Sequence, residues 1–474
     1  MRPEGVPHIR DYAGGHIHMI GIGGSSMSGL AQMLADRGYT VTGSDRDDGY
    51  LLPLLESRGI QVTVGQRAEN VHGADLAVYT AAIPADNPER VECARLGIPT
   101  MERAWLLGQL MEGDREAVGI CGAHGKTTTT SMLSQILMEG GMDPSIHIGG
   151  QLDAIGGSTR VGRGGIFLAE ACEFNRSFLK LRPTVAVVLN IDADHLDCYK
   201  DIDEIEETFG EFLRLLPESG TAIGNGDDPR ILRQMAKLSC RTVTFGLTDS
   251  SDYHPVSLRE DAEGYASFDL ALGENILCGV TMRVPGLFNV QNALAALAAA
   301  HVLGADMRQA AASVSAFVGA HRRFELTDTV DGVEIFTDYG HNPAEMANAI
   351  RIARKRVDAR GGRLIAVMQP HTFSRVRSLF ADYLTCTAPA DITLVTDICA
   401  AREKDPGDLN SGMLVDGMKK NGIDAYWTPS FDDTEAWLRA HWQPGDLVLT
   451  MGCGDINLLN MQIHRHEAEK RPQA

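Results

Sequence analysis

A glycine-rich segment in the second quarter of the chain has the composition of a phosphate-binding loop. An apolar run, AVGIC, leads into it, and a helical pattern follows. Its residues are Gly122, Ala123, His124, Gly125, Lys126, Thr127 and Thr128. Glycines let backbone N–H groups wrap phosphate oxygens, a lysine reaches the β and γ phosphates, and a hydroxyl helps to hold Mg²⁺. The segment therefore predicts a Mg-ATP site, although it is shorter than the common G-x4-G-K-[ST] loop because Ile120 stands at the position of the first glycine.

Two further apolar runs, GIFLAE and TVAVVLNI, end in groups that can bind a metal ion. These groups are Glu170, Glu173, Asp192, Asp194, His195 and Asp197. The carboxyl ends of parallel strands lie at one edge of a sheet, so we expect these side chains beside the phosphate loop. We predict Glu170 and His195 as ligands of Mg²⁺ or of its water, and Glu173 and Asp197 as outer or solvated charges.

A second glycine-rich turn lies near the start of the chain, after the apolar run HIHMI. Gly21, Gly23 and Gly24 allow a tight turn into a helix that starts around Ser26, whose free N–H groups favour a phosphate. Asp45 ends the next apolar run, about where a dinucleotide-binding fold places the acid that binds ribose. Ser26 replaces the third glycine of a nicotinamide site. One alternative is that the turn binds another diphosphate-linked nucleoside. The other is that the glycines serve only the close packing of the strand against the helix.

Four apolar runs in the last third of the chain also end in polar loops. They are VEIFTD, RLIAVM, DITLV and DLVLTM, and the polar residues that follow the first two are Asp338, Tyr339, His341, His371 and Arg375. A second site is expected at this sheet edge. Arg322 and Arg323 precede these runs, and an arginine near a domain joint can reach a transferring phosphoryl group.

Short apolar runs alternate with helical patterns from end to end, which predicts the α/β class with parallel sheets. The length of 474 residues suggests about three domains. We expect a Rossmann-like domain over residues 1–113, a central ATPase-type parallel sheet over 114–320, and a C-terminal Rossmann-like domain over 321–474.

Composition narrows the possible partners. With 63 acidic and 43 basic residues the net charge is -20, which disfavours nucleic acid and anionic lipid. The most apolar helical stretch, residues 293–305, is shorter than the roughly 20 residues that span a bilayer, so we expect no membrane insertion. The start of the chain has no secretory pattern. Nine scattered cysteines without a CxxC pair predict reduced thiols and a cytoplasmic location.

The order of these segments resembles the Mur ligases along nearly the whole chain. The matching segments are GIGGSSMSG, CGAHGKTTTT, NIDADHLDCY, GLFNVQNALAALA, HRRFE, TDYGHNPAE, QPHTFSR and GCGDI. The resemblance implies that ATP phosphorylates the lactyl carboxylate of UDP-N-acetylmuramate. The amine of L-alanine then attacks the acyl phosphate, which makes a peptidoglycan precursor.

The resemblance also implies roles for individual residues. Lys126 would stabilise the transferring phosphoryl group, Thr127 and Glu170 would hold one Mg²⁺, and His195 would hold a second. Asn289 and Asn292 match positions that hold ATP, whereas Arg323 and Asp338 match residues that close over it. The residues implied for the UDP-sugar are Gly21, Gly23, Gly24, Ser25, Ser26 and Asp45, and those for the amino acid are Tyr339, His341 and Arg375.

Several departures from the family pattern bear on the substrate. Sister ligases carry a carbamylated lysine where this chain has Gly210, and no lysine lies between Lys200 and Lys237. This favours the alanine-adding member of the family. The other departures stand at Ala123, Phe288 and Asn342.

Three other functions remain open from the sequence. The first is a recycling ligase that adds a tripeptide to the same sugar nucleotide. The second is a non-catalytic nucleotide-binding partner, and the third is a nicotinamide oxidoreductase built on the first domain. We expect a monomer or a homodimer.

Overall fold

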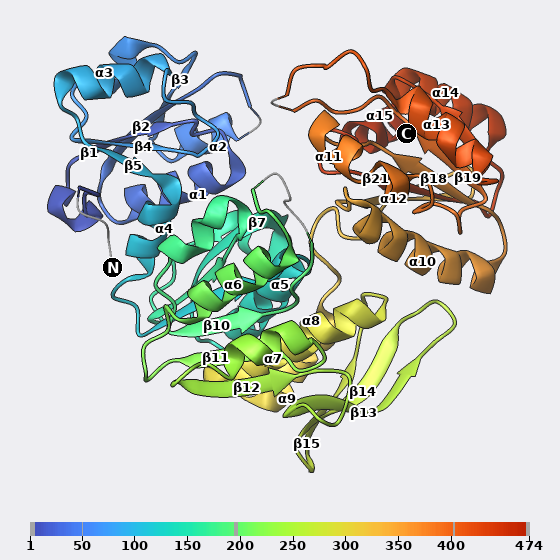
Figure 1. The fold of residues 1–474 in the computed structure, drawn as a ribbon, viewed down its shortest axis with the longest axis horizontal. Helices are drawn as coiled ribbons and strands as arrows, with labels where there is room; N and C mark the ends of the chain where they lie inside the picture. Colours follow the sequence, from blue (N-terminus) through green and yellow to red (C-terminus); the bar gives the residue numbers. More distant parts are fainter. Residues whose placement is uncertain (1–4, 50, 194–197, 402, 471–474) are drawn as a thin grey trace. The chain divides into compact units, whose positions relative to one another are not determined.

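The computed structural model describes residues 5–49, 51–193, 198–401 and 403–470, which form three β-sheets with helices packed on them (Figure 1). The chain packs as two compact bodies. The first contains the residues up to Ser257 together with Phe268–Val280 and Phe288–Phe317, and the second contains Leu258–Ser267, Thr281–Leu287 and the residues from Val318 onward. The predicted α/β class is confirmed.

The first sheet has five parallel strands in the order β3-β2-β1-β4-β5. Its strands are β1 (His16–Ile20), β2 (Thr40–Asp45), β3 (Gln61–Val64), β4 (Leu76–Tyr79) and β5 (Thr100–Glu102). Its helices are α1 (Ser25–Asp36), α2 (Leu52–Ser57), α3 (Pro88–Leu96) and α4 (Arg103–Met111). The chain moves from β1 outward in both directions, so the end of β1 is the switch point at which such sheets bind ligands.

The central sheet has ten strands in the order β15-β14-β13-β12-β11-β10-β6-β9-β7-β8. The first five along the chain are β6 (Glu116–Cys121), β7 (Ser145–Leu152), β8 (Gly157–Arg160), β9 (Ile166–Glu170) and β10 (Val185–Val188). The others are β11 (Thr221–Asn225), β12 (Arg241–Phe245), β13 (Tyr253–Glu260), β14 (Ala266–Leu272) and β15 (Asn275–Thr281). Because β6 lies between β9 and β10 and is parallel to both, the three carboxyl ends meet at one edge, as predicted.

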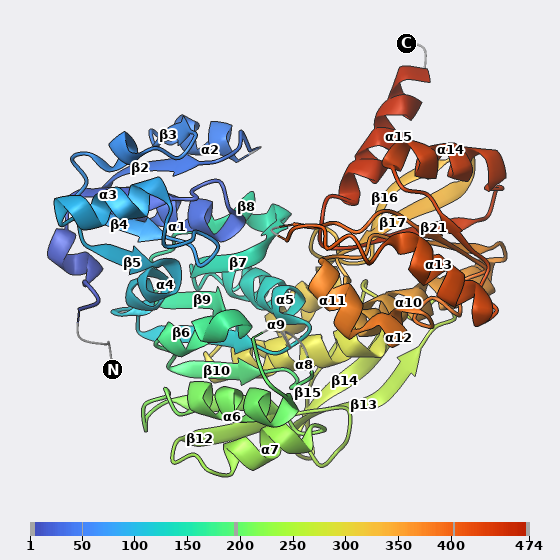
Figure 2. The same ribbon diagram turned by 45° about the horizontal axis from the view of Figure 1, so that its top comes forward.

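Helices cover both faces of the central sheet (Figure 2). They are α5 (Lys126–Glu139), α6 (Ile202–Leu213), α7 (Pro229–Met235), α8 (Leu287–Val302) and α9 (Met307–Ala316). The crossover through α5 runs from β6 toward β7, whereas those through α6 and α7 run the opposite way along the sheet. Right-handed crossovers therefore place α5 on one face and α6 with α7 on the other. Short 3-10 helices lie at Ile9–Tyr12, Ala68–Val71, Asp153–Ile155 and Phe174–Lys180.

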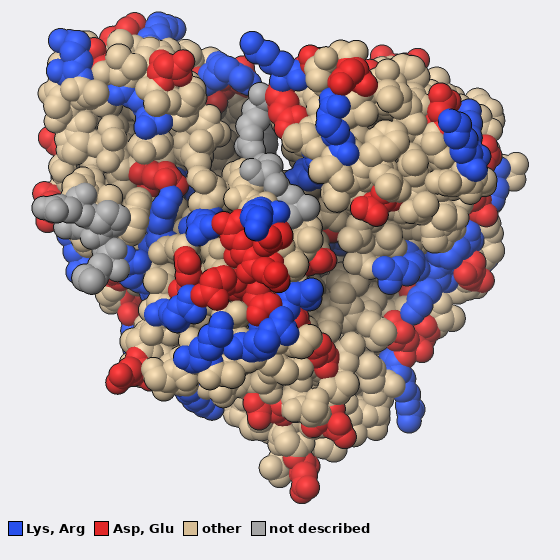
Figure 3. All heavy atoms as spheres, in the orientation of Figure 1, with Lys and Arg blue, Asp and Glu red and all other residues tan. Residues whose placement is uncertain are grey.

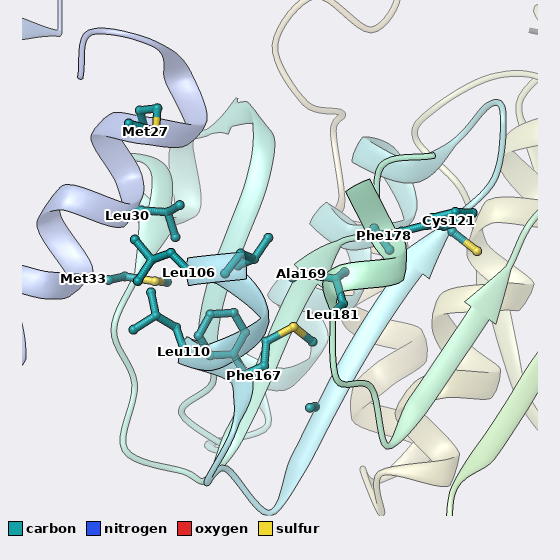
Figure 4. Close-up of a cluster of buried hydrophobic side chains, with 14 of the residues drawn as sticks. Met27, Leu30, Met33, Leu106, Leu110, Cys121, Phe167, Ala169, Phe178 and Leu181 are labelled. Carbon is teal, nitrogen blue, oxygen red and sulfur yellow. The ribbon is translucent and has the colours of Figure 1, made fainter. Parts of the chain in front are cut away.

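One apolar core joins the first two sheets. Side chains of α1, including Leu30, meet Leu106 and Leu110 of α4 and Phe167 of β9 (Figure 4). All four side chains are buried. Burying each such side chain stabilises the fold by about 1.5–3 kcal/mol, so the two sheets hold together as one body.

The third sheet has six strands in the order β16-β17-β21-β18-β19-β20. They are β16 (Glu325–Val330), β17 (Val333–Asp338), β18 (Leu364–Met368), β19 (Ile392–Val395), β20 (Ala425–Trp427) and β21 (Leu447–Met451). The four predicted apolar runs form its four inner strands, which are parallel. The helices are α10 (Pro343–Arg360), α11 (Phe373–Ser378), α12 (Phe380–Tyr383), α13 (Ser411–Lys420), α14 (Phe431–His441) and α15 (Asn457–Lys470).

Acidic side chains gather over α6, with basic side chains beside them (Figure 3). Two ion pairs join Arg214 to Glu207 and Arg233 to Glu206, each with a distance of 2.6 Å between the guanidinium nitrogen and the carboxylate oxygen. All nine cysteines are free thiols, as predicted. Within the described ranges, no helix combines the length and the apolar composition that a membrane crossing requires.

Candidate active site

The phosphate loop connects the end of β6 to the start of α5. Gly125 has a φ of 85°, in the left-handed region that favours glycine. A Cβ atom there would lie 2.3 Å from the side-chain oxygen of Asn292, so a larger residue does not fit. Among the described residues no side chain caps the start of α5, and a helix start of this kind favours a phosphate.

Lys126 is held at the base of this loop. Its Nζ donates to the carbonyl oxygens of Gly122 at 2.5 Å and Ala123 at 3.2 Å, and it lies 2.9 Å from Oε1 of Glu173. Burial lowers the pKa of Lys126, but Glu173, Cys172 and Glu170 together more than offset this effect, and the net pKa is raised. The lysine is therefore a positive charge fixed beside the loop.

Glu173, which was expected as an outer or solvated charge, is not solvated. Its side chain is only 4% exposed and contacts Lys126 directly. The Tyr199 hydroxyl donates to the backbone oxygen of Glu173 at 2.5 Å, which fixes the turn that carries it. The strand pattern located this acid near the site but contained nothing that indicated its pairing with the lysine.

Asn190, which the sequence analysis missed, braces the tip of the loop. Its Oδ1 accepts from the backbone N–H of His124 at 2.8 Å, and its Nδ2 donates to the backbone oxygen of the same residue at 3.0 Å. The His124 ring lies 3.3 Å from Asp192. The available signal was a polar residue two positions after the end of the buried strand β10.

Glu170 and Thr127 both approach β7, at the neighbouring residues Gly149 and Gly150. A Cβ atom at Gly149 would lie 2.9 Å from Oε2 of Glu170, and one at Gly150 would lie 2.8 Å from the methyl group of Thr127. Thr127 of the phosphate loop and the Glu170 carboxylate thus lie near the same two residues of β7. This donor set fits Mg²⁺, which takes one or two protein oxygens together with phosphates and waters. Within the described residues no group of three or more His, Cys, Asp or Glu side chains could hold a metal ion.

Asp194, His195 and Asp197 lie outside the residues that the structure describes. The role of His195 as a metal ligand therefore stays a prediction.

Asn289 and Asn292 of α8 lie beside the phosphate loop, as the resemblance implied. Asn292 Nδ2 donates to Asn289 Oδ1 at 3.1 Å, and Asn292 Oδ1 accepts from the Thr129 hydroxyl at 3.3 Å. Both asparagines are buried. Hydrogen bonds therefore tie α8 to the first turn of α5.

The glycine turn of the first sheet is closed by Asp45. The carboxylate accepts from the backbone N–H of Gly23 at 2.8 Å, and a Cβ atom on Gly23 would lie 2.9 Å from it. Gly21 has a φ of 82°. Asp45, which was expected near a ribose, thus also holds the turn in shape.

Ser25 connects this turn to the phosphate site within the first body. Its hydroxyl donates to the backbone oxygen of Gly149 at 3.0 Å, and Gly149 is the residue that lies against Glu170. The predicted UDP-sugar turn and the predicted ATP site therefore approach the same part of β7, around Gly149.

In the second body, Asp338 ends β17 and accepts from the backbone N–H groups of Phe324 at 2.9 Å and Gly340 at 2.7 Å. Burial raises the pKa of this carboxyl, and the Arg323 charge opposes the rise. The guanidinium groups of Arg322 and Arg323 each lie 4.9 Å from the centre of the Tyr339 ring. Arg323 and Asp338 therefore lie close together, and their closure over ATP stays a prediction.

The predicted amino-acid residues also cluster in the second body. The rings of Tyr339 and His341 are 5.8 Å apart, and those of His341 and His371 are 6.3 Å apart. The guanidinium of Arg375 lies 3.3 Å from Nδ1 of His371. Asn342, one of the departures from the family pattern, caps α10 by accepting from the backbone N–H of Glu345.

Comparison with known families matches most of the chain. Residues 16–115 match the model described as "Mur ligase family, catalytic domain". Residues 120–300 match "Mur ligase middle domain", and residues 322–454 match "Mur ligase, glutamate ligase domain".

Curated relatives and solved structures agree with this assignment. The chain is 42% identical to the UDP-N-acetylmuramate--L-alanine ligase of Acetivibrio thermocellus, over 93% of this chain and 94% of the relative. It is 43% identical to the ligase of the same name from Caldanaerobacter subterraneus, over 93% and 95%. The fold resembles the UDP-N-acetylmuramate-alanine ligase MurC of Thermotoga maritima, with a TM-score of 0.82 and 24% identity over 96% of this chain and 100% of that one. A murein peptide ligase of Psychrobacter arcticus has a TM-score of 0.72 and 26% identity, over 95% and 98%. The chain belongs to the Mur ligase family.

Proposed function

We propose that this enzyme joins L-alanine to the lactyl carboxylate of UDP-N-acetylmuramate with ATP and Mg²⁺, in peptidoglycan precursor biosynthesis. Curated relatives of nearly full length carry the name of this reaction. The observation that carries the proposal is the buried, charged Lys126 in a phosphate loop that lies beside Glu170 and Thr127. We assign residues 1–113 to the sugar nucleotide, 114–320 to ATP and 321–474 to the amino acid.

In the first step, an oxygen of the lactyl carboxylate attacks the γ phosphorus of ATP, the bond to the bridging oxygen breaks, and ADP leaves. Lys126 stabilises the charge that develops on the transferred phosphoryl group. Thr127 and Glu170 would hold Mg²⁺, which neutralises phosphate charge when it is bound. Arg323 adds a second positive charge from the C-terminal domain.

In the second step, the neutral amine of L-alanine attacks the acyl carbon. A C–N bond forms, the C–O bond to phosphate breaks, and the amine proton is released. Arg375 would pair the alanine carboxylate in a bidentate manner, which orients the amine. Tyr339 and His341 line the same pocket.

Gly210 argues against the sister ligases that use a carbamylated lysine. It is buried in α6, and a Cβ atom there would lie 2.3 Å from Oε1 of Gln234. A lysine side chain at this position would displace Gln234. The tripeptide-adding reaction is the remaining alternative within the family.

Phosphate release from Mg-ATP and UDP-N-acetylmuramate tests the proposal, with L-alanine, glycine, L-serine and the L-Ala-D-Glu-diamino-acid tripeptide supplied separately. Release that is fastest with L-alanine supports it. Release only with the tripeptide would assign the recycling reaction, and no release with any acceptor would overturn the proposal.

We place this reaction in the cytoplasm, where ATP and free thiols are maintained. The enzyme would act there as a monomer or a homodimer. Analytical ultracentrifugation distinguishes these two states.

A further inference from the structure

We propose that Arg103 binds an anionic group of the sugar nucleotide where the glycine turn of the first sheet meets the central sheet. The proposal rests on the sugar-nucleotide role proposed above for the first domain. It adds a binding residue that lies outside the glycine turn. Arg103 is the first residue of α4, far from Gly21–Ser26 in the sequence.

A chain of hydrogen bonds orients the guanidinium. Arg103 Nη1 donates to the Ser26 hydroxyl at 2.6 Å, and this hydroxyl lies 2.7 Å from Nε2 of His147 on β7. The other ring nitrogen of His147 lies 3.4 Å from the Thr159 hydroxyl. Through Ser26, these hydrogen bonds link Arg103 on α4 to His147 on β7 of the central sheet.

The protonation state of His147 determines which group donates and which accepts in each of these hydrogen bonds. Burial, followed by the nearby Arg103 charge, lowers the pKa of His147 to about 3. The ring is therefore neutral at pH 7, and one ring nitrogen must accept a hydrogen bond. With Nδ1–H directed to Thr159, Nε2 accepts from Ser26, and the Ser26 oxygen is left to accept from Arg103.

Arg103 forms no direct ion pair with a carboxylate of the described residues, although the Glu102 charge lies near enough to favour its charged form. Within the described ranges no Asp or Glu oxygen lies within 4.0 Å of its guanidinium, and the adjacent Glu102 pairs instead with Lys180 at 2.6 Å. Burial lowers the pKa of Arg103, so the charge costs free energy where it lies. One N–H is bound to Ser26, which leaves the others for an anion.

Two anionic groups of UDP-N-acetylmuramate meet this requirement, the diphosphate and the lactyl carboxylate. Both offer oxygens that accept two N–H groups of one guanidinium. The junction leads toward the phosphate site, because Ser25 bonds to Gly149, which lies against Glu170. Either group would therefore be held on the way to the phosphate loop.

Calorimetric titration of UDP-N-acetylmuramate and UDP-N-acetylglucosamine, which lacks the lactyl carboxylate, tests this role in the full-length enzyme. We expect Arg103→Ala to weaken UDP-N-acetylmuramate binding by about tenfold or more, with ATP affinity unchanged. Arg37→Ala is the matched control, because Arg37 is another partly buried arginine of the first domain and, among the described residues, its guanidinium donates to the backbone oxygen of Leu110 alone. It should leave both affinities unchanged.

The comparison of ligands identifies the bound group. An equal loss for both sugar nucleotides assigns Arg103 to the diphosphate, and a loss confined to UDP-N-acetylmuramate assigns it to the carboxylate. The proposal is overturned if the Arg103→Ala variant binds both sugar nucleotides as tightly as the unmodified enzyme does. If that variant does not fold, Arg103→Gln, which keeps most of the side-chain volume, decides by the same criteria. Failure of the unmodified enzyme to bind either sugar nucleotide would instead overturn the proposed function.

Discussion

Nζ of Lys126 lies 2.9 Å from Oε1 of Glu173, and both side chains are largely buried. The lysine expected to meet the γ phosphate is thus already paired within the protein. Removing one partner of a buried ion pair leaves the other charge uncompensated, which is strongly destabilising. The role of Glu173 as the partner of Lys126 can therefore be tested separately from the role of Glu170 as a proposed ligand of Mg²⁺.

Glu173→Gln should lower the free energy of unfolding by about 2 kcal/mol or more, because it leaves the Lys126 cation buried without a counter-charge. Glu207→Gln is the control, since its partner Arg214 is exposed to solvent and such pairs contribute only about 0–1 kcal/mol. Denaturant-induced unfolding measures the free energy of unfolding of both variants. Equal effects of the two substitutions would contradict the importance of the buried pair.

Lys126→Ala should reduce kcat by about 100-fold or more, because a charge that stabilises the transferred phosphoryl group is lost. Binding of UDP-N-acetylmuramate should be retained. Lys200→Ala, which removes a lysine whose side chain is 85% exposed, serves as the control. Steady-state kinetics and calorimetry measure the two properties, and normal turnover by Lys126→Ala would remove the phosphate loop from the mechanism.

Asn190→Ala should raise the KM for ATP by about tenfold, because two hydrogen bonds of about 1 kcal/mol each hold the backbone of His124 in the loop. Asn190→Asp keeps the acceptor and loses the donor, so its effect should be intermediate. Asn421→Ala, at an exposed position in the second body, should have no effect. An unchanged KM in Asn190→Ala would show that the loop keeps its shape without the clamp.

Arg375→Ala should raise the KM for L-alanine and leave the KM values for ATP and UDP-N-acetylmuramate unchanged, because only the amino-acid carboxylate loses its partner. Arg377→Ala is the control two residues away, since that side chain is exposed and pairs with Asp408. Initial-rate kinetics with each substrate varied in turn separate the three constants. A uniform change in all three would contradict the assignment.

The buried, neutral His147 predicts a loss of stability in mild acid. Its pKa is about 3 in the folded protein and about 6.5 when unfolded. Between these values the unfolded state binds a proton that the folded state does not, so stability falls as pH falls and is independent of this group above about pH 6.5. At pH 5 the loss is about 2 kcal/mol.

His147→Gln should flatten this dependence, because glutamine does not titrate. Unfolding free energies of both proteins at pH 7.5 and pH 5 provide the test. Parallel losses in the two proteins would show that other groups cause the acid sensitivity.

The sequence was sufficient to predict the strands and the carboxyl-end edges on which the site is built. Buried parallel strands such as β6 and β18 are continuous apolar runs, and the glycines of the phosphate loop mark the turn. Three sheets of the α/β class were predicted and are confirmed. The prediction of these strands succeeds because the local spacing of apolar residues indicates secondary structure.

Other features depend on contacts between segments distant in sequence. The pairing of Lys126 with Glu173, the clamp from Asn190 to His124 and the bond from Arg103 to Ser26 each join residues from different elements. No local pattern encodes such contacts. The shared core of the first two sheets was missed for the same reason, since Leu106 and Phe167 read as ordinary core residues of separate domains.

The transfer of oxygen from the sugar carboxylate to phosphate tests the central claim most directly. UDP-N-acetylmuramate labelled with ¹⁸O in the lactyl carboxylate is incubated with Mg-ATP and L-alanine, and the released phosphate is analysed by mass spectrometry. An acyl phosphate predicts that each phosphate carries an ¹⁸O atom from the carboxylate, because the C–O bond breaks when the amine attacks. Amide formation with unlabelled phosphate would contradict the mechanism.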